Sequence, residues 1–356
     1  MARIQSIATA VPAYEVPQAA VQQRVREHFA PAFPNIDHYL PVFRHAQIDT
    51  RFMVRPLEWW DEQRTFGQCN QVFVEEALVL GRQAIERCLA PRGLSPQDID
   101  HLLVVTTTGL AAPSLDALLI HELGMGRHTR RTPIWGLGCA GGIGGLARAA
   151  EYVRAEPTHR ALLLNVEFCS LTYLAADLSK RNLIATSLFS DGVAAVLVEG
   201  AEVAPAGERP APVRVVDTLS TLYPGTPEIM GWNIVDGGFE VVFSSRIPGI
   251  VRDQFPPLLR EFLGRHGLEQ GDIGRYLLHP GGAKVIGAYQ EALGLDPAQL
   301  AVSRSVLRRY GNMSSATVFF VMEEALREQP LAPGEYGILA VFGPGFSAEL
   351  ALVRGE

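Results

Sequence analysis

Short apolar runs recur along the chain and alternate with stretches of helical periodicity. The runs cover residues 101–109, 132–138, 160–168, 192–200, 213–220, 275–279, 336–343 and 348–355. Because they are apolar at nearly every position, they predict strands that helices cover on both faces. Between the runs, apolar residues fall at helical spacing, as from Asn70 to Leu89. The pattern predicts an α/β fold.

Two stretches interrupt this alternation. Gly343-Pro344-Gly345 joins the last two predicted strands, and such a sequence is typical of a tight turn that closes a hairpin. Residues 201–212 are rich in Pro, Ala and Gly and lie between two strand signals. We therefore divide the chain into two halves, residues 1–205 and 206–356, in each of which strands alternate with helices.

Composition narrows the class of protein. The 356 residues are 47% hydrophobic, which suffices for a sizeable core, and the net charge of -7 argues against nucleic acid and anionic membrane as partners. We find no signal peptide pattern and no apolar run long enough to span a membrane. The four cysteines form no CxxC pair, so we expect neither a disulfide framework nor a metal site. These features indicate a soluble cytoplasmic protein.

Cys139 lies where a predicted strand runs through Gly138-Cys139-Ala140-Gly141-Gly142 into a helical pattern. A thiol near a helix N-terminus is favoured as the nucleophilic thiolate. The flanking glycines would let a thioester approach the backbone, whose N–H groups could hold an oxyanion. The alternative is a small buried hydrophobic residue, as most free cysteines are.

His279 ends the predicted strand RYLLH and precedes Pro280-Gly281-Gly282. A neutral imidazole at such a strand end could activate a thiol or donate to a thioester carbonyl. Asn312 follows Gly311 and precedes Met313-Ser314-Ser315-Ala316 and an apolar helix. It could serve as a neutral donor that does not titrate. The alternatives are a structural histidine, and an Asn312 or Ser314 that only caps the helix.

Together these motifs resemble those of the type III polyketide synthases, the chalcone synthase-like members of the thiolase fold. His-Pro-Gly-Gly at 279–282 and Tyr-Gly-Asn-Met-Ser-Ser-Ala at 310–316 match the family's patterns unbroken. The cysteine motif matches with one residue fewer, residues 341–345 resemble the family's Gly-Phe-Gly-Pro-Gly loop, and Phe189 matches its gatekeeping phenylalanine. The resemblance runs in order across nearly the whole chain.

The resemblance implies a duplicated, thiolase-like fold with α-β-α-β-α layers. The first half would carry the nucleophile Cys139, and the second half would carry His279 and Asn312. Cys139 would accept an acyl group from acyl-CoA, and the other two would stabilise the enolate formed from malonyl-CoA by loss of CO2. No cofactor is implied beyond these CoA thioester substrates. Further substrate contacts are implied at Thr107, Cys169, Thr172, Phe189, Gly281, Ser314, Arg51 and Lys284.

Departures from the plant enzymes are more similar to the bacterial branch that makes alkylpyrones or alkylresorcinols. Cys169 stands where the plant cavity often has threonine, and a second cavity phenylalanine is replaced near Val241. A less crowded pocket would suit a fatty acyl starter, although Cys169 could equally be a packing residue. At the CoA end the family's basic segment is mostly absent, which leaves Lys284 as the first candidate for a phosphate contact, with Arg51 near by.

The resemblance also implies a homodimer, in which the loop 109–113 reaches towards the partner's cavity and offers only the small Ala112. Three other functions remain open. The first is a ketoacyl synthase of the fatty-acid initiating type, which would take malonyl groups from a carrier protein. The second is a non-catalytic thiolase-fold subunit, which would be expected to lack one of the three residues. The third is a hydrolytic cysteine enzyme, for which the sequence shows no hydrolase pattern.

Overall fold

The computed structural model describes residues 1–204 and 212–356. The predicted boundary between residues 205 and 206 lies outside the described residues. Within them, nine strands form one mixed sheet in the order β11-β12-β13-β8-β1-β7-β6-β4-β5. The strands are β1 (Ala2–Ala10), β4 (His101–Thr106), β5 (Arg130–Trp135), β6 (Arg160–Phe168), β7 (Asp191–Gly200), β8 (Val213–Leu222), β11 (Ile273–Leu278), β12 (Tyr336–Gly343) and β13 (Ser347–Gly355).

The sheet consists of two halves that meet at β1 and β8. These two strands pair over only three positions, from Ala2 opposite Val215 to Ile4 opposite Val213. On one side β4 runs parallel to both β5 and β6, and on the other β11 runs parallel to β12. The strands β12 and β13 form an antiparallel hairpin that pairs up to Gly343 and Ser347, which confirms the predicted tight turn.

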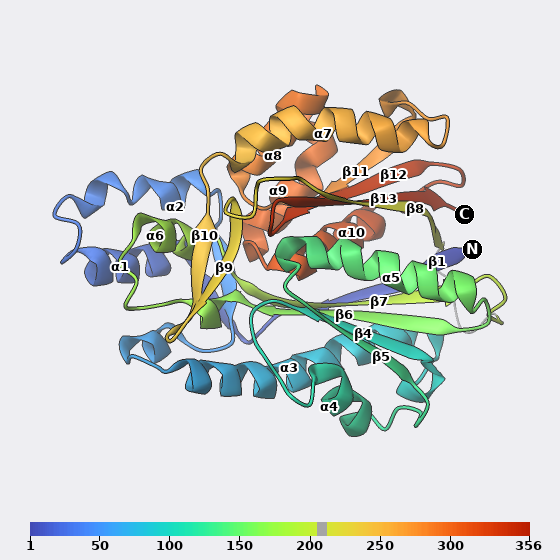
Figure 1. The fold of residues 1–356 in the computed structure, drawn as a ribbon, viewed down its shortest axis with the longest axis horizontal. Helices are drawn as coiled ribbons and strands as arrows, with labels where there is room; N and C mark the ends of the chain where they lie inside the picture. The colour runs from blue at the N-terminus through green and yellow to red at the C-terminus, as the bar shows by residue number, and fades with distance from the viewer. Residues whose placement is uncertain (205–211) are drawn as a thin grey trace.

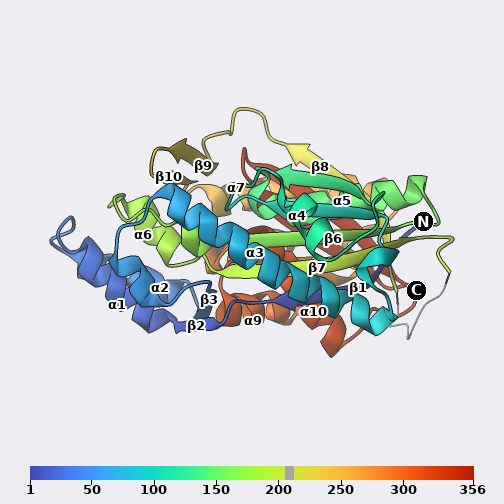
Figure 2. The same cartoon turned by 90° about the horizontal axis from the view of Figure 1, so that it is seen from below.

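Helices form three layers around the two half-sheets, as Figure 1 shows. Between the halves lie α5 (Gly141–Ala155) and α10 (Thr317–Glu328), whose apolar residues share one core with both half-sheets. The outer face of the first half is covered by α3 (Phe66–Leu89) and α4 (Leu115–Glu122), and Figure 2 shows α3 running along it. On the outer face of the second half lie α7 (Ile247–Gly264) and α8 (Ala283–Leu293). The predicted α-β-α-β-α layering is confirmed.

Smaller elements gather at one end of the layers (Figure 1). They are α1 (Gln18–Phe29), α2 (Pro41–His45) and α6 (Lys180–Thr186), with two short antiparallel strand pairs, β2 (Tyr14–Pro17) with β3 (Thr50–Met53) and β9 (Met230–Val235) with β10 (Gly238–Phe243). Helix α9 (Ala301–Tyr310) instead lies beside α10, and its Val306 belongs to the central core. The hydrophobic pattern predicted none of these four short strands, nor β1. In β9 the apolar side chains include exposed ones, so no continuous apolar run marks the strand.

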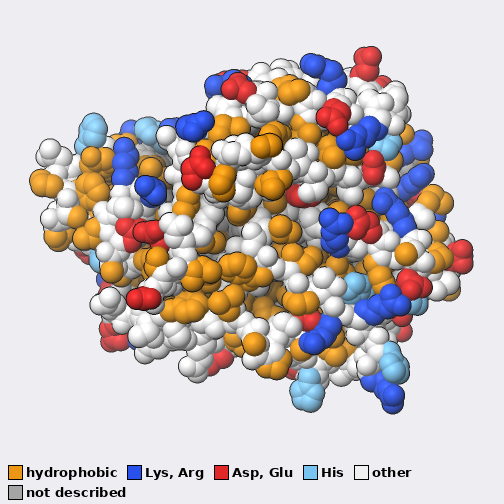
Figure 3. Space-filling model, in the orientation of Figure 1, with side chains coloured by type: hydrophobic (Ala, Val, Ile, Leu, Met, Phe, Trp, Pro, Cys, Tyr) orange, Lys and Arg blue, Asp and Glu red, His pale blue; other side chains and the backbone are white. Residues whose placement is uncertain are grey.

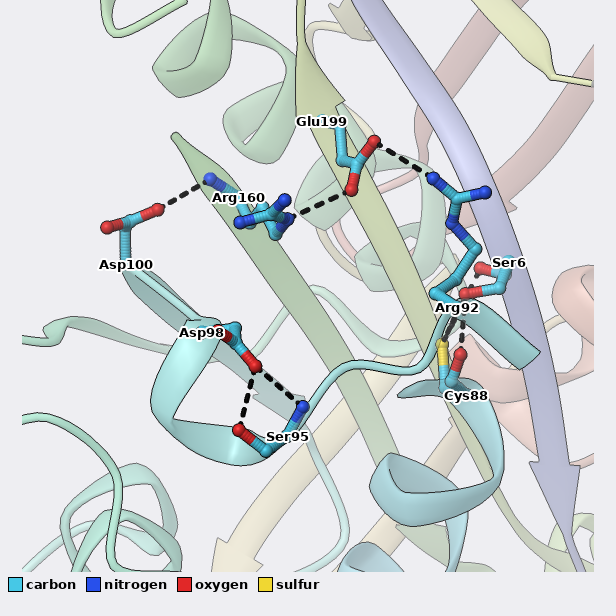
Figure 4. A network of polar contacts seen from close by, with 8 residues as sticks. All are labelled: Ser6, Cys88, Arg92, Ser95, Asp98, Asp100, Arg160 and Glu199. Atoms are coloured by element: carbon cyan, nitrogen blue, oxygen red, sulfur yellow. Dashed lines mark hydrogen bonds and ion pairs between the residues drawn. The ribbon is translucent and has the colours of Figure 1, made fainter. Parts of the chain in front are cut away.

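A network of polar contacts lies at the start of β6, as Figure 4 shows. Arg160 donates to Asp100 through its backbone N–H at 2.8 Å and to Glu199 through its side chain at 3.0 Å. Close by, Ser6 donates to the carbonyl of Cys88, and burial raises the pKa of the Cys88 thiol to about 12. Cys169 follows the opposite end of β6. The network therefore lies at the ends of β6 and β7 that are farther from Cys169 and from the cavities described below.

Two further features bear on the class of protein. All four cysteines are free, as their spacing predicted. No helix among the described residues is long and apolar enough to cross a membrane.

Candidate active site

Cys139 lies on the predicted turn from strand to helix. After β5 ends at Trp135, a short 3-10 turn spans Gly138–Ala140, and α5 begins at Gly141. Gly138 has a φ of +48°, and a Cβ there would lie 2.6 Å from the ring of Pro344, so only glycine fits. The backbone N–H of Gly138 donates to the Thr107 hydroxyl at 2.9 Å. Thr107 thus holds the loop that carries the thiol.

The glycines after Cys139 allow helix α5 to pack closely against neighbouring segments of the chain. A Cβ on Gly142 would lie 2.4 Å from the carbonyl oxygen of Ser315, and one on Gly141 would lie 2.5 Å from Val105. The expectation that these glycines make room for a thioester is therefore wrong for both positions. Their absent side chains instead let α5 lie against the segment that carries Asn312.

His279 follows β11 directly and is 2% exposed. Its backbone N–H donates to Ala340 on the neighbouring strand at 3.0 Å, so the residue continues the sheet. Neither ring nitrogen has a hydrogen-bond partner among the described residues. Burial lowers the pKa of His279 to about 3, which keeps the imidazole neutral as predicted. Both nitrogens are thus left for groups that enter the cavity or move within it.

The Asn312 side chain is fixed by hydrogen bonds at both its amide nitrogen and its oxygen, which also accepts from the Thr317 hydroxyl at 3.5 Å. Its amide nitrogen donates to the carbonyl of Gly281 at 3.2 Å, and its oxygen accepts from the N–H of Ser314 at 2.9 Å. Since α10 begins only at Thr317 and has no side-chain cap, neither Asn312 nor Ser314 caps that helix. The bond to Gly281 uses one of the two amide hydrogens of Asn312. The Asn312 side chain also hydrogen-bonds the Cys139 sulfur, which lowers the pKa of that thiol.

Phe189 is held beside Asn312 by the backbone. The N–H of Asn312 donates to Leu188, and the carbonyl of Asn312 accepts from Ser190, both at 2.9 Å. This bridge passes close to Gly311, where φ is +72° and a Cβ would lie 3.0 Å from the Arg51 side chain. Phe189 and Asn312 are far apart in the sequence, and this backbone bridge places them side by side as one unit.

Two adjoining cavities meet at this unit. The catalytic cavity has a volume of about 50 Å³ and includes Cys139, His279 and Asn312 in its wall. The large cavity, of about 320 Å³, extends towards α1 and α6. Four residues border both cavities and form a junction between them: Cys169, Phe189, Trp232 and Val241.

The other residues predicted to contact substrate lie in three places. Gly281 and Ser314 line the catalytic cavity, and Thr172 and Arg51 line the large one. Arg51 is only 1% exposed, and its guanidinium donates to the carbonyls of Thr186 and Phe189. Thr107 and Lys284 line neither cavity. Thr107 is buried behind Cys139, and Lys284 is exposed in the first turn of α8.

The charge state of Cys139 differs from the expectation. Burial raises the pKa of its thiol to about 12, against the effect of the Ser314 hydroxyl, and the carboxylate of Glu167 raises it further. The helix N-terminus was predicted to favour the thiolate, and burial outweighs that effect. A thiolate here needs a cation, and proton transfer to His279 would form both charges together without net charge in the cavity.

Sequence reasoning missed Glu167, which lies behind the nucleophile. It is fully buried, and its carboxylate accepts from the backbone of Thr107 at 3.0 Å and from the Thr108 and Ser315 hydroxyls at 2.9 and 2.7 Å. Burial raises the pKa of Glu167 to about 7. The signal was a lone acidic residue inside the apolar run RALLLNVEF, where an unpaired charge is costly.

The catalytic cavity brings together a cysteine, a neutral histidine and a fixed amide. This arrangement, in a thiolase-like fold, defines a thiolase-fold condensing enzyme. The family models agree in detail. Residues 1–202 match the N-terminal domain of chalcone and stilbene synthases, and residues 214–356 match the C-terminal domain. The chain belongs to this family, the type III polyketide synthases.

Relatives and solved structures extend over the same length. A putative chalcone synthase of Bacillus subtilis is 41% identical, with 100% of this chain and 99% of the relative covered. An alpha-pyrone synthesis polyketide synthase-like protein of Mycobacterium tuberculosis is 31% identical over 98% of this chain and 90% of the relative. The crystal structure of 1,3,6,8-tetrahydroxynaphthalene synthase from Streptomyces coelicolor matches with a TM-score of 0.93 and 31% identity over 99% of both chains.

Proposed function

We propose that this type III polyketide synthase extends a fatty acyl starter with malonyl-CoA and closes the product to a pyrone or a resorcinol. The observation that carries the proposal is the large cavity of about 320 Å³, which shares the four wall residues of the junction with the catalytic cavity. Apolar side chains from several elements line it, including Val21, Val25, Met53, Leu57 and Ala185. Such a wall suits an alkyl chain, since each buried methylene contributes about 0.8 kcal/mol.

In the first step, Cys139 would accept the starter. His279 takes the thiol proton, the sulfur attacks the thioester carbonyl, and the bond from that carbon to the sulfur of CoA breaks. The departing CoA sulfur receives the proton back from His279. The alkyl tail then extends through the junction into the large cavity, and the acyl-sulfur bond stays in the catalytic cavity.

In the second step, His279 and Asn312 would act on malonyl-CoA. A ring N–H of His279 and the side-chain amide of Asn312 donate to the malonyl thioester oxygen, where negative charge collects as CO2 leaves. The enolate carbon attacks the acyl carbon on Cys139 and breaks its bond to sulfur. Because both donors are neutral and held in place, they need little rearrangement as the charge develops.

The starter preference follows from the relative sizes of the two cavities. The catalytic cavity of about 50 Å³ has no room for a long chain, and the adjoining large cavity offers further volume with apolar side chains in its wall. Among the relatives, the Mycobacterium tuberculosis protein is named for alpha-pyrone synthesis. These two observations favour an alkylpyrone or alkylresorcinol over a product built from malonyl units alone.

The test is turnover of purified protein with malonyl-CoA and acyl-CoAs of graded length, with products identified by mass spectrometry. We expect alkylpyrones or alkylresorcinols from octanoyl-CoA and longer starters, and none from Cys139→Ala. Activity confined to aromatic or malonyl starters would refute the fatty acyl assignment. Condensation only after carrier protein is added would instead assign the protein to the ketoacyl synthases that initiate fatty-acid synthesis.

At the CoA end, we propose that Lys284 contacts a phosphate. Its neighbour Val285 lines the catalytic cavity, and Lys284 itself is exposed at the start of α8. We expect Lys284→Gln to raise the KM for malonyl-CoA several-fold and to leave kcat unchanged, since an exposed charge contributes binding rather than chemistry. An unchanged KM at low salt would refute the contact. We further infer a cytoplasmic location, where CoA thioesters are available.

We also propose that the chain forms a homodimer through β5. This strand is at the edge of the nine-stranded sheet formed by the described residues, with Trp135 42% exposed at its end. Trp135 donates to the carbonyl of Gly109 at 3.1 Å and lies 6.3 Å from the ring of Phe239 on β10. Figure 3 shows hydrophobic side chains gathered around this part of the face, and Ile234 on the same hairpin is 62% exposed.

Sedimentation velocity tests the dimer. We expect Trp135→Glu to shift the protein towards the monomer at micromolar concentration, because it places a charge in an apolar interface. Leu222→Glu is the matched control, since Leu222 is 69% exposed on β8, away from the β5 edge. A wild-type monomer, or an equal effect of both variants, would refute the interface.

A further inference from the structure

Tyr289 brings an unpaired hydroxyl to the catalytic cavity. It lies in α8 and borders the cavity together with Cys139, His279 and Asn312. The residue is 1% exposed, and its Oη has no hydrogen-bond partner among the described residues. A buried hydroxyl without a partner costs free energy, so its presence calls for a partner that arrives with the substrate.

The ring of Tyr289 needs no hydroxyl for its packing. It meets Phe255 edge-on at 5.3 Å and stacks on Phe342 at 6.2 Å with an interplanar angle of 25°. Both contacts are apolar and would hold a phenylalanine equally well. The polar atom is therefore an addition to a site that already packs as an aromatic cluster.

The surroundings of Tyr289 define what it can bind. The neighbouring wall of the cavity is apolar, with Ile247, Val285 and Phe342. Burial raises the pKa of Tyr289, and a thiolate at Cys139 would raise it further, so the hydroxyl keeps its proton. It thus acts as a hydrogen-bond donor rather than as a base, and its partner must be an oxygen acceptor. An alkyl chain offers none.

We propose that the Tyr289 hydroxyl donates a hydrogen bond to a carbonyl oxygen of the thioester substrate. The inference rests on the proposed function, in which the alkyl tail occupies the large cavity and the oxygen-bearing part of the chain remains in the catalytic cavity. Two parts of the substrate carry such an oxygen: the β-keto groups of the growing chain and the amides of the pantetheine arm of malonyl-CoA. Tyr289 is a substrate-binding residue that acts beside His279 and Asn312.

Tyr289→Phe tests the contact, because it removes one oxygen atom and leaves the ring in place. Tyr223→Phe is the matched control. Its Oη is also buried and without a partner among the described residues, its ring lies 5.7 Å from Phe346, and it lines neither cavity. For Tyr289→Phe we expect a change of about 3- to 10-fold in malonyl-CoA affinity or in the product ratio, the size typical of one neutral hydrogen bond. For Tyr223→Phe we expect no change in either quantity.

Two readouts distinguish the sources of the carbonyl. A contact to the pantetheine arm raises the dissociation constant of malonyl-CoA, measured by calorimetry in the Cys139→Ala background. A contact to the keto chain leaves that constant unchanged and shifts the products towards shorter chains, by about 3- to 10-fold in the ratio of triketide to longer products. Either result supports the proposal.

Unchanged malonyl-CoA binding together with an unchanged product ratio would overturn it, as would an equal effect of Tyr223→Phe. The failure of the proposed function looks different. In that case the wild-type protein makes no alkyl product from any fatty acyl-CoA. The calorimetric comparison, and the product ratio with whichever starter the wild type accepts, still decide whether Tyr289 binds substrate.

Discussion

The junction between the two cavities offers the sharpest test of how the chain selects its starter. Val241 lies on β10 opposite Trp232, is 5% exposed and borders both cavities. Phenylalanine at this position adds a ring where the alkyl tail must pass. Val241→Phe should therefore close the route into the large cavity without touching Cys139, His279 or Asn312.

The magnitude follows from the apolar surface that the tail buries. An octanoyl starter carries roughly six methylenes more than an acetyl starter, and at about 0.8 kcal/mol each they contribute up to about 5 kcal/mol. Full use of this energy corresponds to more than a thousandfold in kcat/KM. Since part of it is spent on ordering the tail, we expect Val241→Phe to reduce the preference for octanoyl over acetyl by roughly a hundredfold.

The assay compares kcat/KM for acetyl-CoA and octanoyl-CoA at saturating malonyl-CoA. We expect the acetyl value to stay within about 3-fold of the wild type, since only the tail meets the new ring, and Val241→Ala to keep the octanoyl preference. An unchanged octanoyl value in Val241→Phe would refute passage of the tail through the junction. An equal fall for both starters would show general damage to the site instead.

Three further predictions concern the site and the packing around it. Asn312→Ala should slow malonyl-CoA decarboxylation by about 10²- to 10³-fold, measured as CO2 release, and leave acylation of Cys139 intact, because only the enolate loses a donor. Gly142→Ala should lower the free energy of unfolding by about 1–3 kcal/mol in urea titrations, because its Cβ would lie 2.4 Å from the Ser315 oxygen, whereas Gly249→Ala, with open space, should not. Burial raises the pKa of Glu167 from 4.5 to about 7, so its folded form favours the proton, and its contribution to stability is present below pH 4.5 and lost as the pH rises through 7. The free energy of unfolding, measured by urea titration, should therefore change less between pH 5 and pH 8 in Glu167→Gln than in the wild type, by up to about 3 kcal/mol. An equal change in both proteins would contradict this.

Local signals in the sequence determined most of the sheet and the identity of the three central residues. The run 160–168 became β6 with the predicted bounds, because a strand covered on both faces must be apolar throughout. Helix α3 begins at Phe66 rather than near Asn70, because the capping box of Thr65 and Gln68 starts the helix there. That signal was present in the sequence and is local too.

Other features depended on segments that meet only in the folded chain. Strand β1 and the β9–β10 hairpin lack a continuous apolar run, and their pairing with distant or neighbouring strands made them β-structure. The glycines after Cys139 pack against Val105 and Ser315, and no local pattern distinguishes that role from a path for substrate. No local pattern marks the unpaired hydroxyl of Tyr289 either, because the lack of a partner depends on the residues that surround it in the folded chain.

The chemistry of the site divides in the same way. The residue types and their motifs were legible in the sequence, because a nucleophile, a neutral donor and an amide each require a particular side chain. The direction of the Cys139 pKa shift could not be predicted from the sequence, because a helix N-terminus lowers the pKa and burial raises it. Only the folded structure sets the depth of burial. The volume and junction of the two cavities were likewise decided by tertiary packing, because they are enclosed by side chains from α1, α6, β10 and the segment of Asn312, which the chain brings together only on folding.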